Sequence, residues 1–422
     1  RTGAGLGGGF GAQRLSDDMS SGQILHFGVG NFFRAHLADY TQNAGGWRII
    51  GVSLRSASIA DGLKKQNNTY TLCVQGTEHK RIDILQQVLV APQNPGAVLT
   101  YVVDPRVKII SLTVTEKAYC LGPDNRLDLA HPLIQADLSG QEPQTAVGFL
   151  ARGLANRRAP LTVLCCDNLS ANGDVLGAAV RDFAARAGLS INWDLVEFPN
   201  SMVDRITPAT SDELRFSTGD PMAVPTEPFC EWVIEDRFAD VRPNWPGVQF
   251  VPDVAPYEMR KLRMLNGAHS YLAYAGLAAG YDYVHQAVAD EGLRRSAAQL
   301  MDEAAQTLSG DLRTGSQAYG LALLVRFENP HLHHQLRQIA MDGSQKIPYR
   351  WGDSLRALAQ QGVSAPALSQ AVTAWIGFCC AEVAAGRALQ DPADHAIASA
   401  VQGPAPKRDL LALVGIDPAL LS

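Results

Sequence analysis

Residues 26–36, HFGVGNFFRAH, connect a short apolar run to the first helical pattern of the chain. Gly28 and Gly30 stand where the strand would end and the helix begin, and a tight turn there lets backbone N–H groups meet a pyrophosphate. Phe33 replaces the third glycine of the usual dinucleotide fingerprint. A bare Gly-x-Gly is a weak signal that could merely turn the chain, but its strand–loop–helix context favours dinucleotide binding. The residues expected at this cofactor site are Gly28, Gly30, Asn31 and Phe32.

The next predicted strand ends without the acidic residue that usually binds the ribose hydroxyls of NAD. It closes in GVSLRS, residues 51–56, so that Arg55 stands there and the first acid is Asp61. An arginine at this position can accept a 2′-phosphate, and it can equally be a solvated strand end. We expect NAD as the cofactor, and the sequence leaves NADP open.

Short runs rich in β-branched residues alternate with helical patterns around this turn. The strand-like runs are QILHFGVG, WRIIGVSL, VKIISLTVT and LTVLCC. This alternation is typical of a parallel, doubly wound sheet covered by helices, which is a Rossmann-type α/β domain. After Pro256 the pattern changes to long Ala- and Leu-rich helical segments, such as residues 257–280, and strand-like runs become rare.

This change of pattern divides the chain of 422 residues. Residues 1–22 are Gly-rich and aperiodic, and we expect a flexible leader there. A dinucleotide-binding Rossmann-type domain is expected over residues 23–253. An all-helical substrate and catalytic domain is expected over residues 254–422, with the active site in the cleft between the two domains.

The composition excludes several classes of protein. Apolar residues make up 46% and charged residues 18% of the chain, without a long apolar span or a secretory leader pattern, so we expect a soluble, cytoplasmic protein. A net charge of −6 with scattered basic residues argues against a nucleic-acid or membrane partner. The seven cysteines include no Cys-x-x-Cys pair, which argues against a disulfide framework or a zinc knuckle. The expected partner is a small molecule, and monomer and dimer both stay open.

A helical stretch in the second half, YEMRKLRMLNGAHSYLAY, combines an apolar face with unexpected polar residues. The predicted core face consists of Leu262, Leu265, Ala268 and Leu272, and the polar residues are Glu258, Lys261, Asn266 and His269. Reduction of a ketone needs a proton donor and groups that stabilise an oxyanion, and a partly buried lysine and an asparagine suit these two tasks. Alternatively, Lys261 pairs with Glu258 on the surface and His269 is an ordinary core histidine.

Asp167 and Asn168 follow the buried run LTVLCC, at the strand end where open α/β sheets place their ligands. Asn168 is therefore a second candidate oxyanion donor. The alternative is a helix cap, with Asn172 and Gly173 turning the chain.

Other polar clusters stay ambiguous from the pattern alone. Two segments, 198–208 and 227–238, read either as a site wall or as a salt-bridge network between domains, because acids and arginines are dense there: Asp204, Arg205, Glu235, Asp236 and Arg237. The histidines His331, His333 and His334 lack the spacing of a zinc site and are expected in a solvated loop or helix start. Lys346 follows a glycine turn. Two alternatives stay open for it: it binds a phosphate or a substrate carboxylate, or it is solvated.

From about residue 23 to residue 348 the chain resembles the mannitol dehydrogenase family of polyol dehydrogenases and fructuronate reductases. The similar blocks occur in the family's order and are HFGVGNFFRAH, SLTVTEKAYC, CCDNLSANGD, FPNSMVDRITPAT, TEPFCEWVIEDRF, KLRMLNGAHSYLAY and QIAMDGSQKIP. The sequence departs from the family pattern at Phe33, where histidine is frequent, and at Gln338, where arginine is frequent. The part after Trp351 is only loosely similar.

The resemblance implies an NAD(P)-dependent oxidoreductase that works without a metal. It implies that Lys261 is the general acid/base, that Asn168 and Asn266 stabilise the oxyanion, and that His269 contacts a substrate hydroxyl. It also implies that Glu258, one turn before the lysine, exchanges protons with water. Asp204 is added to the residues expected at the cofactor.

The blocks TEKAYC and QIAMDGSQKIP are more similar to fructuronate reductases, because mannitol 2-dehydrogenases tend to carry glycine at the position of Lys117. We therefore expect D-fructuronate and D-mannonate as the substrate pair, with a carboxylate bound by Lys117, Lys346 and Arg337. The alternatives are a mannitol 2-dehydrogenase acting on D-mannitol and D-fructose, another polyol dehydrogenase, and a non-catalytic nucleotide-binding protein.

Overall fold

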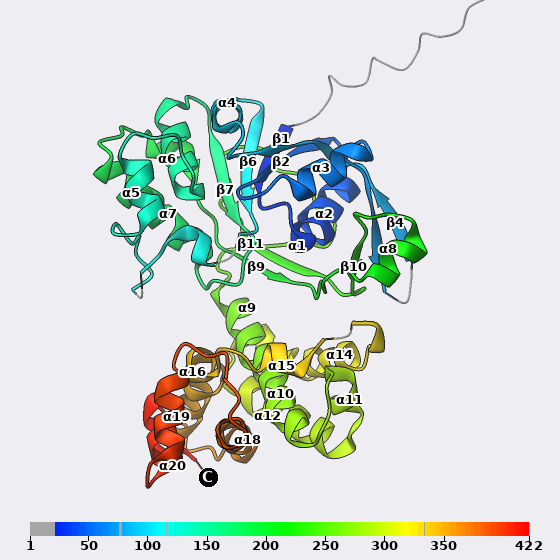
Figure 1. Ribbon diagram of the computed structural model, residues 1–422, viewed down its shortest axis with the longest axis vertical. Helices are drawn as coiled ribbons and strands as arrows, with labels where there is room; N and C mark the ends of the chain where they lie inside the picture. The colour runs from blue at the N-terminus through cyan, green and yellow to red at the C-terminus, as the bar shows by residue number, and fades with distance from the viewer. Residues whose placement is uncertain (1–21, 76–77, 115, 123, 333, 422) are drawn as a thin grey trace, which may run out of the picture. The chain divides into compact units, whose positions relative to one another are not determined.

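The computed structural model describes residues 22–75, 78–114, 116–122, 124–332 and 334–421 (Figure 1). Of the segment expected to be a flexible leader, only Gly22 lies within the described residues, and it begins the first strand. The chain forms two compact units. Within the described residues, the first unit comprises 22–74, 78–225 and 230–252, and the second comprises 75, 226–229 and 253–421.

The first unit is built on a six-stranded sheet whose neighbouring strands are all parallel. Across the sheet the strands are β5 (Leu85–Val90), β2 (Trp47–Ser53), β1 (Gly22–Phe27), β6 (Val107–Leu112), β7 (Leu161–Cys165) and β8 (Val196–Glu197). This is the order of a doubly wound Rossmann-type domain, so the predicted fold class is confirmed. The order reverses between β1 and β6, and sheets of this kind bind ligands beside that switch point.

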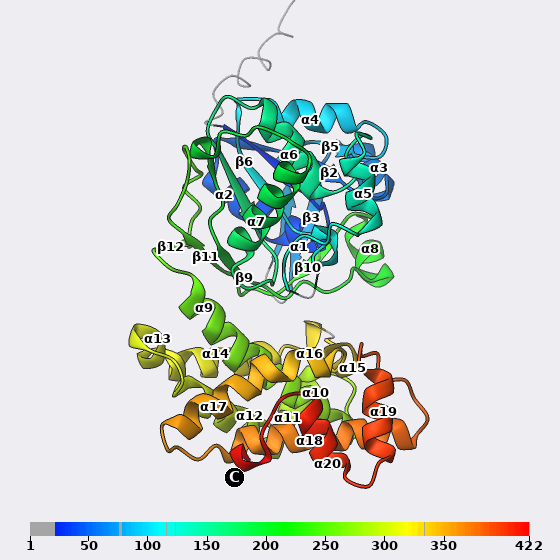
Figure 2. The same cartoon turned by 90° about the vertical axis from the view of Figure 1, so that its left-hand side faces the viewer.

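Both faces of this sheet are covered. Ile24 of β1 packs in the core that contains α1 (Asn31–Ala35) and α2 (Leu37–Ala44). Its neighbour Leu25 packs on the opposite face, in the core with α4 (Pro95–Val103), α6 (Ala146–Asn156) and α7 (Asn172–Arg186) (Figure 2). Successive side chains of a strand point to opposite faces of the sheet. Because both faces are covered here, the sequence of each central strand is a nearly continuous run of apolar residues.

Two small sheets complete the first unit. One has the order β10 (Val224–Thr226), β3 (Tyr70–Val74) and β4 (Glu78–Ile82), and the other has the order β12 (Gln249–Val251), β11 (Glu231–Glu235) and β9 (Ser201–Asp204). The remaining helical segments are α3 (Ser58–Lys65), η1 (Glu116–Tyr119), α5 (Pro132–Leu138), η2 (Trp193–Leu195) and α8 (Asp212–Thr218). The small sheets contain antiparallel pairs, which the βα alternation of the sequence does not reveal.

Every named element after Pro252 is helical in the described residues, as predicted. The elements are α9 (Ala255–Arg260), η3 (Lys261–Asn266), α10 (Gly267–Ala278), α11 (Val284–Ala289), α12 (Glu291–Ala305), α13 (Gly310–Thr314), α14 (Ser316–Phe327), η4 (Pro330–Leu332), α15 (Leu336–Ile339), α16 (Gly343–Ile347), η5 (Pro348–Gly352), α17 (Asp353–Gln360), α18 (Pro366–Ala384), α19 (Asp394–Gln402), α20 (Pro406–Leu413) and η6 (Pro418–Leu420). Helix α10 lies at the centre, packed against α12 and α18. Leu265, Ala268 and Leu272 lie in this core as predicted, whereas Leu262 is only partly buried.

Helix α18 is long and apolar enough to cross a membrane when judged by composition alone. It packs against α10 and α12, and it buries Leu368, Val372 and Trp375 in the core of the second unit. The apolar composition of α18 therefore reflects its place inside the helical unit.

A buried ion pair joins distant parts of the second unit. The guanidinium of Arg326, on α14, donates two hydrogen bonds to the carboxylate of Glu227, at 2.9 and 2.7 Å. The ring of Phe229 packs against the same guanidinium. The segment 226–229 is thus tied to α14 although it is far from it in sequence.

Candidate functional site

The turn after β1 needs glycine at position 28. Gly28 has φ +100°, and its N–H donates to the carbonyl of Val52 at 2.9 Å. A Cβ atom there would lie 2.6 Å from the carbonyl oxygen of Thr113 on the neighbouring chain segment. Gly30 differs, because its φ of −77° suits any residue and nothing lies within 4 Å of its Cβ position. The absent side chain of Gly30 leaves space beside the loop, which fits the close approach of a pyrophosphate.

Phe33 explains how the turn works without a third glycine. That glycine normally permits close packing of the first helix on the sheet. Here the buried ring of Phe33 stacks on the ring of His26, with centroids 3.8 Å apart. His26 in turn bridges β1 to β6 through hydrogen bonds to Ser111 and Thr113. Burial lowers the pKa of His26 to about 3, so its ring is neutral and packs like an aromatic residue.

The side chains of Asn31 and Phe32 contact other residues of the first unit. Asn31 donates to the carbonyl of Pro208 at 3.2 Å and to the hydroxyl of Thr210 at 3.1 Å. The ring of Phe32 stacks on that of His36. The predicted cofactor role of these two residues therefore rests on their backbone N–H groups at the start of α1, which have no intrahelical partner.

A cavity of about 930 Å³ opens at the carboxyl ends of β2 and β5, beside η1. Its lining is largely apolar and includes Leu54, Ala91, Pro92, Ala118 and Leu133. Arg55 also lines it and is exposed. The position and size of the cavity fit the adenosine end of a dinucleotide whose pyrophosphate lies at the Gly28–Gly30 turn.

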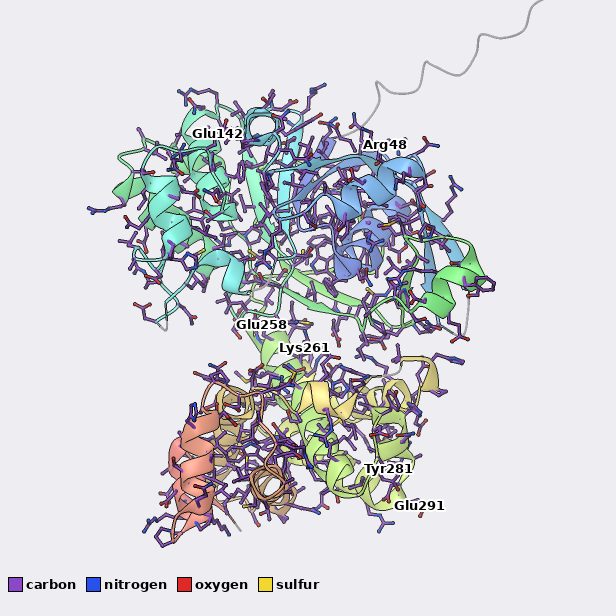
Figure 3. The ribbon with its side chains drawn as sticks, in the orientation of Figure 1. Arg48, Glu142, Glu258, Lys261, Tyr281 and Glu291 are labelled. Carbon is purple, nitrogen blue, oxygen red and sulfur yellow. The ribbon has the colours of Figure 1, made fainter. Side chains whose placement is uncertain are left out.

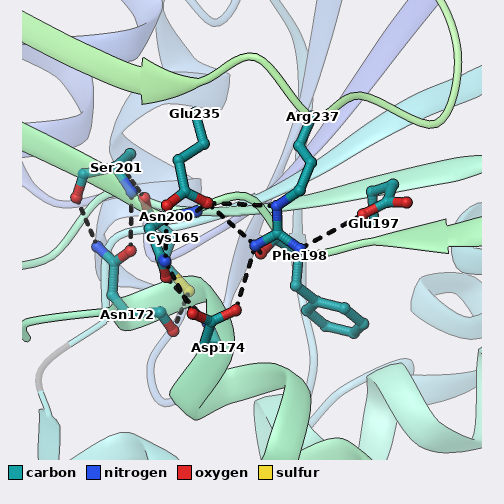
Figure 4. Close-up of polar contacts among 9 residues, drawn as sticks. All are labelled: Cys165, Asn172, Asp174, Glu197, Phe198, Asn200, Ser201, Glu235 and Arg237. Carbon is teal, nitrogen blue, oxygen red and sulfur yellow. Dashed lines mark hydrogen bonds and ion pairs between the residues drawn. The ribbon is translucent and has the colours of Figure 1, made fainter. Parts of the chain in front are cut away.

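Glu235 and Arg237 belong to a network inside the first unit (Figure 4), whereas Glu227 belongs to the second unit. Arg237 lies at the centre of one network, with ion pairs to Asp174, Glu197 and Glu235 at 3.2, 3.5 and 3.0 Å. Asn200 donates to the carboxylates of Asp174 and Glu235. These residues are a salt-bridge network, and the network lies within one unit rather than between domains.

Arg205 and Asp236 form separate ion pairs. Arg205 is buried and forms an ion pair with Asp39 at 3.0 Å, and Asp236 lies 3.3 Å from Arg242. Asp204 ends β9 and is only 4% exposed, opposite Glu231 in the register of β11.

The loop after β7 presents Asn168, which is exposed, beside the half-buried Asp167. The carboxylate of Asp167 accepts hydrogen bonds from the buried hydroxyl of Tyr119 and from the N–H of Leu169. Asn168 is not a helix cap, because α7 begins at Asn172 with Ala171 in the cap position. Tyr119 comes from the block TEKAYC, and its link to the Asn168 loop appears only in the folded chain.

The alternative for this segment, in which Asn172 and Gly173 turn the chain, is wrong, because both residues belong to α7. Asn172 is fully buried as the first residue of α7. Its side-chain amide exchanges two hydrogen bonds, each of 3.0 Å, with the backbone of Ser201 (Figure 4). Gly173 is needed because a Cβ atom there would lie 2.4 Å from the carbonyl of Pro199.

The helical segments that begin at Ala255 carry the remaining predicted catalytic residues, of which Glu258 and Lys261 are labelled in Figure 3. Glu258 lies in α9, Lys261 and Asn266 are the first and last residues of the π-helical segment η3, and His269 lies in α10. Five residues along an α-helix rotate the side chain by roughly 140°. The wider i→i+5 turn of a π-helix makes this rotation smaller, so residues five apart lie closer to one side. The π-turn therefore brings the Cα–Cβ directions of Lys261 and Asn266 closer together than a regular α-helix would.

His269 is buried beside a second histidine. It is 6% exposed, and its ring centroid lies 4.5 Å from that of Phe327 and 5.0 Å from that of His334. Burial is the main cause that lowers the pKa of His269, and the neighbouring His334, Arg326 and Arg350 lower it further. A neutral imidazole can donate one hydrogen bond and accept another, which matches a hydroxyl group.

The structure corrects the expectation for the histidines of residues 331–334. His334 is half-buried against His269, and burial lowers its pKa, so it is not in a solvated loop. His331 is exposed in η4, as expected, and His333 lies outside the described residues.

The cations expected at a substrate carboxylate are partly engaged elsewhere. Lys346 donates to the carbonyl of Met341 at 2.6 Å, and burial lowers its pKa. Arg337 is exposed and forms an ion pair with Glu382 at 3.3 Å. Gln338 is exposed in α15. Lys117 belongs to η1, and its side chain lies outside what the structure describes.

Two family models match most of the chain. The model of the mannitol dehydrogenase Rossmann domain matches residues 22–247, and that of the mannitol dehydrogenase C-terminal domain matches residues 253–415. The second match continues past Trp351, so the similarity extends further along the chain than the sequence blocks indicated.

The matched relatives are similar over most of their length. The D-mannonate oxidoreductase of Escherichia coli (strain K12) is 40% identical over 84% of this chain and 79% of the relative. A mannitol 2-dehydrogenase of Pyrenophora tritici-repentis is 37% identical, over 93% of this chain and 76% of the relative. The structure of Pseudomonas fluorescens mannitol 2-dehydrogenase in ternary complex with NAD and D-mannitol superposes with a TM-score of 0.78, at 34% identity, over 93% of this chain and 86% of that one. The chain therefore belongs to the mannitol dehydrogenase family of oxidoreductases.

Proposed function

We propose that this protein interconverts D-fructuronate and D-mannonate with NAD as the cofactor and without a metal. The similarity to the E. coli D-mannonate oxidoreductase supports the choice of substrate. The observation that carries the catalytic part is the π-turn of η3, because it brings the Cα–Cβ directions of Lys261 and Asn266 closer together on a helix whose next turn holds the neutral His269.

The first unit supplies the cofactor-binding residues of this proposal. The Gly28–Gly30 turn accommodates the pyrophosphate, and the cavity beside Arg55 accommodates the adenosine. The exposed guanidinium of Arg55 is compatible with a ribose hydroxyl or a 2′-phosphate, which keeps NADP as the alternative cofactor. The bound nicotinamide supplies the hydride that reduces the ketone carbon.

The proton follows a separate path through residues of this chain. Lys261 delivers a proton to the ketone oxygen as that atom gains electrons, and the amide N–H groups of Asn168 and Asn266 stabilise its developing negative charge. His269 holds a neighbouring hydroxyl of the sugar. Glu258 lies three residues before Lys261, about one helical turn, and exchanges the proton of the lysine with water. In the reverse direction Lys261 accepts the proton of the alcohol.

Recognition of a sugar carboxylate falls to Lys117 and Lys346. The ammonium group of Lys346 has three N–H donors, and its bonds to the carbonyls of Met341 and Ile339, at 2.6 and 3.5 Å, leave one donor for a ligand. Arg337 is a weaker candidate, because it already contacts Glu382, whose carboxylate it shares with Arg387.

A mannitol 2-dehydrogenase is the second candidate. The internal bonds of Lys346 and Arg337 favour it, since a neutral polyol requires no cationic partner. A non-catalytic nucleotide-binding protein is the remaining alternative, and it predicts cofactor binding without turnover of any sugar.

The decisive assay measures NADH and NADPH oxidation by the purified protein with D-fructuronate and D-fructose in parallel, with a chelator present. We expect a higher kcat/KM with D-fructuronate and NADH. Preference for D-fructose would make the protein a mannitol 2-dehydrogenase and leave the lysines 117 and 346 without a role in specificity.

Lys261→Ala tests the mechanism in the same assay. It removes the proton donor, and we expect turnover to fall by roughly 10²–10⁴-fold while NADH binding is retained. Lys407→Ala is the matched control, because Lys407 is exposed on α20. Wild-type turnover by Lys261→Ala would exclude this residue as the acid.

A further inference from the structure

The π-turn η3 lies against a second π-helical segment, η5. π-Turns are rare and arise mostly as single insertions in α-helices, often at functional sites. The extra residue disturbs the regular backbone ladder, so a π-turn persists only where its surroundings favour it. The side chains of η5 that reach η3 and the start of α10 are therefore the groups to consider.

Arg350 and Trp351 of η5 donate to consecutive carbonyl groups where η3 joins α10. The guanidinium of Arg350 donates to the carbonyl of Asn266 at 3.2 Å and to the hydroxyl of Ser270 at 2.6 Å. The indole N–H of Trp351 donates to the carbonyl of Gly267 at 3.2 Å. These bonds fix the backbone of the residue that ends the π-turn.

Arg350 holds this position without an acidic partner. No carboxylate among the residues that the structure describes forms an ion pair with it, and burial lowers its pKa to about 10. A guanidinium with that pKa still carries its charge at neutral pH. Burying a charge without a counter-ion is costly unless hydrogen bonds compensate it, and the Asn266 carbonyl and Ser270 hydroxyl provide this compensation.

We propose that Arg350 is a positioning residue for the reaction, and that its guanidinium holds the π-turn in which Lys261 and Asn266 project closer together than in a regular α-helix. The inference rests on the proposed function of Lys261 and Asn266. It assigns to Arg350 no contact with the substrate. Its contribution is to the placement of the proton donor and of one oxyanion donor relative to each other.

Arg350→Lys keeps the charge but shortens the reach and removes the forked donor geometry. We expect kcat to fall by roughly 10²-fold, since a displacement of about 1 Å in a catalytic group has an effect of this size. The KM for NADH stays unchanged. We also expect faster hydrogen–deuterium exchange in the peptide covering residues 261–270. Arg356→Lys is the matched control, because Arg356 lies in the next helix, α17, and pairs with Asp353 at the surface.

Ser270→Ala provides a second variant that removes one acceptor of the guanidinium without shortening a charged side chain. We expect a smaller loss of kcat and the same region of increased exchange. Wild-type kcat and wild-type exchange over residues 261–270 in both variants would overturn the proposal. If the wild-type protein reduces neither sugar, the proposed function fails, and the exchange measurement alone then decides whether Arg350 holds the π-turn.

Discussion

The two glycines of the β1–α1 turn differ in whether the backbone tolerates a side chain. Substitution of each by alanine should therefore affect stability and NADH binding differently. At Gly30 the backbone has φ −77° and the Cβ position is open, so Gly30→Ala adds a methyl group without strain. Loss of unfolded-state freedom stabilises such a variant by about 0.4–1 kcal/mol, and loss of a favourable N-cap residue offsets a similar amount. We expect the Tm to stay within about 2 °C of wild type. The methyl group occupies the space assigned to the pyrophosphate, so NADH affinity should fall at least tenfold, about 1.4 kcal/mol.

Gly28→Ala should behave in the reverse manner. Its φ of +100° and the 2.6 Å approach of the new Cβ to the Thr113 carbonyl both oppose a side chain. The backbone conformation costs about 1–3 kcal/mol and the overpacking another 1–3 kcal/mol, which together lower the Tm by roughly 5–20 °C.

Both variants are compared by thermal unfolding and by fluorescence titration with NADH at a temperature where each is folded. Unchanged NADH affinity in Gly30→Ala would refute the assignment of this turn to the pyrophosphate. Unchanged stability of Gly28→Ala would show that the turn relaxes more easily than the Thr113 contact indicates.

Two further predictions concern the first unit. Burial lowers the pKa of His26 to about 3, so only the unfolded chain takes up this proton as the pH falls below ~6.5. The free energy of unfolding therefore decreases by about 2 kcal/mol between pH 7 and pH 5. Urea unfolding at these two pH values should show a smaller decrease for His26→Gln. Equal pH dependence in both proteins would contradict this. Tyr119→Phe removes the hydroxyl that donates to Asp167, and we expect the free energy of unfolding to fall by about 1 kcal/mol. Because Asn168 lies next to Asp167, we also expect kcat to fall roughly tenfold while the KM for NADH is unchanged. A loss of stability with wild-type kcat would limit Tyr119 to a structural role.

The Rossmann-type fold was predictable because periodicity carries it: four apolar runs of β-branched residues separated by helical patterns correspond to β1, β2, β6 and β7. The position of Asn168 was predictable for the same reason, since it directly follows one of these runs. The helical second half followed from its Ala- and Leu-rich pattern.

The π-turn was not predictable, because one additional residue in a helical repeat changes the apolar pattern too little to be seen. Leu262 shows this effect, since a regular α-helix would place it in the core. The partners of Lys346 and His334 depend on contacts between segments that no local pattern encodes. Arg350 follows the block QIAMDGSQKIP by two residues, and nothing in its sequence neighbours indicates that it contacts Asn266.

The segment 226–229 limits how this protein can be divided. Family matches end at residue 247 and resume at residue 253, which suggests that a fragment starting at Asp253 would fold alone. Such a fragment would lack Glu227, whose carboxylate lies 2.7 Å from the buried guanidinium of Arg326. Replacing the helical unit of this chain by a single crossover near residue 250 would likewise remove Arg326 and leave Glu227 behind. A fragment or chimaera made from this chain should therefore keep the tetrapeptide TEPF, residues 226–229, together with the helices that follow it.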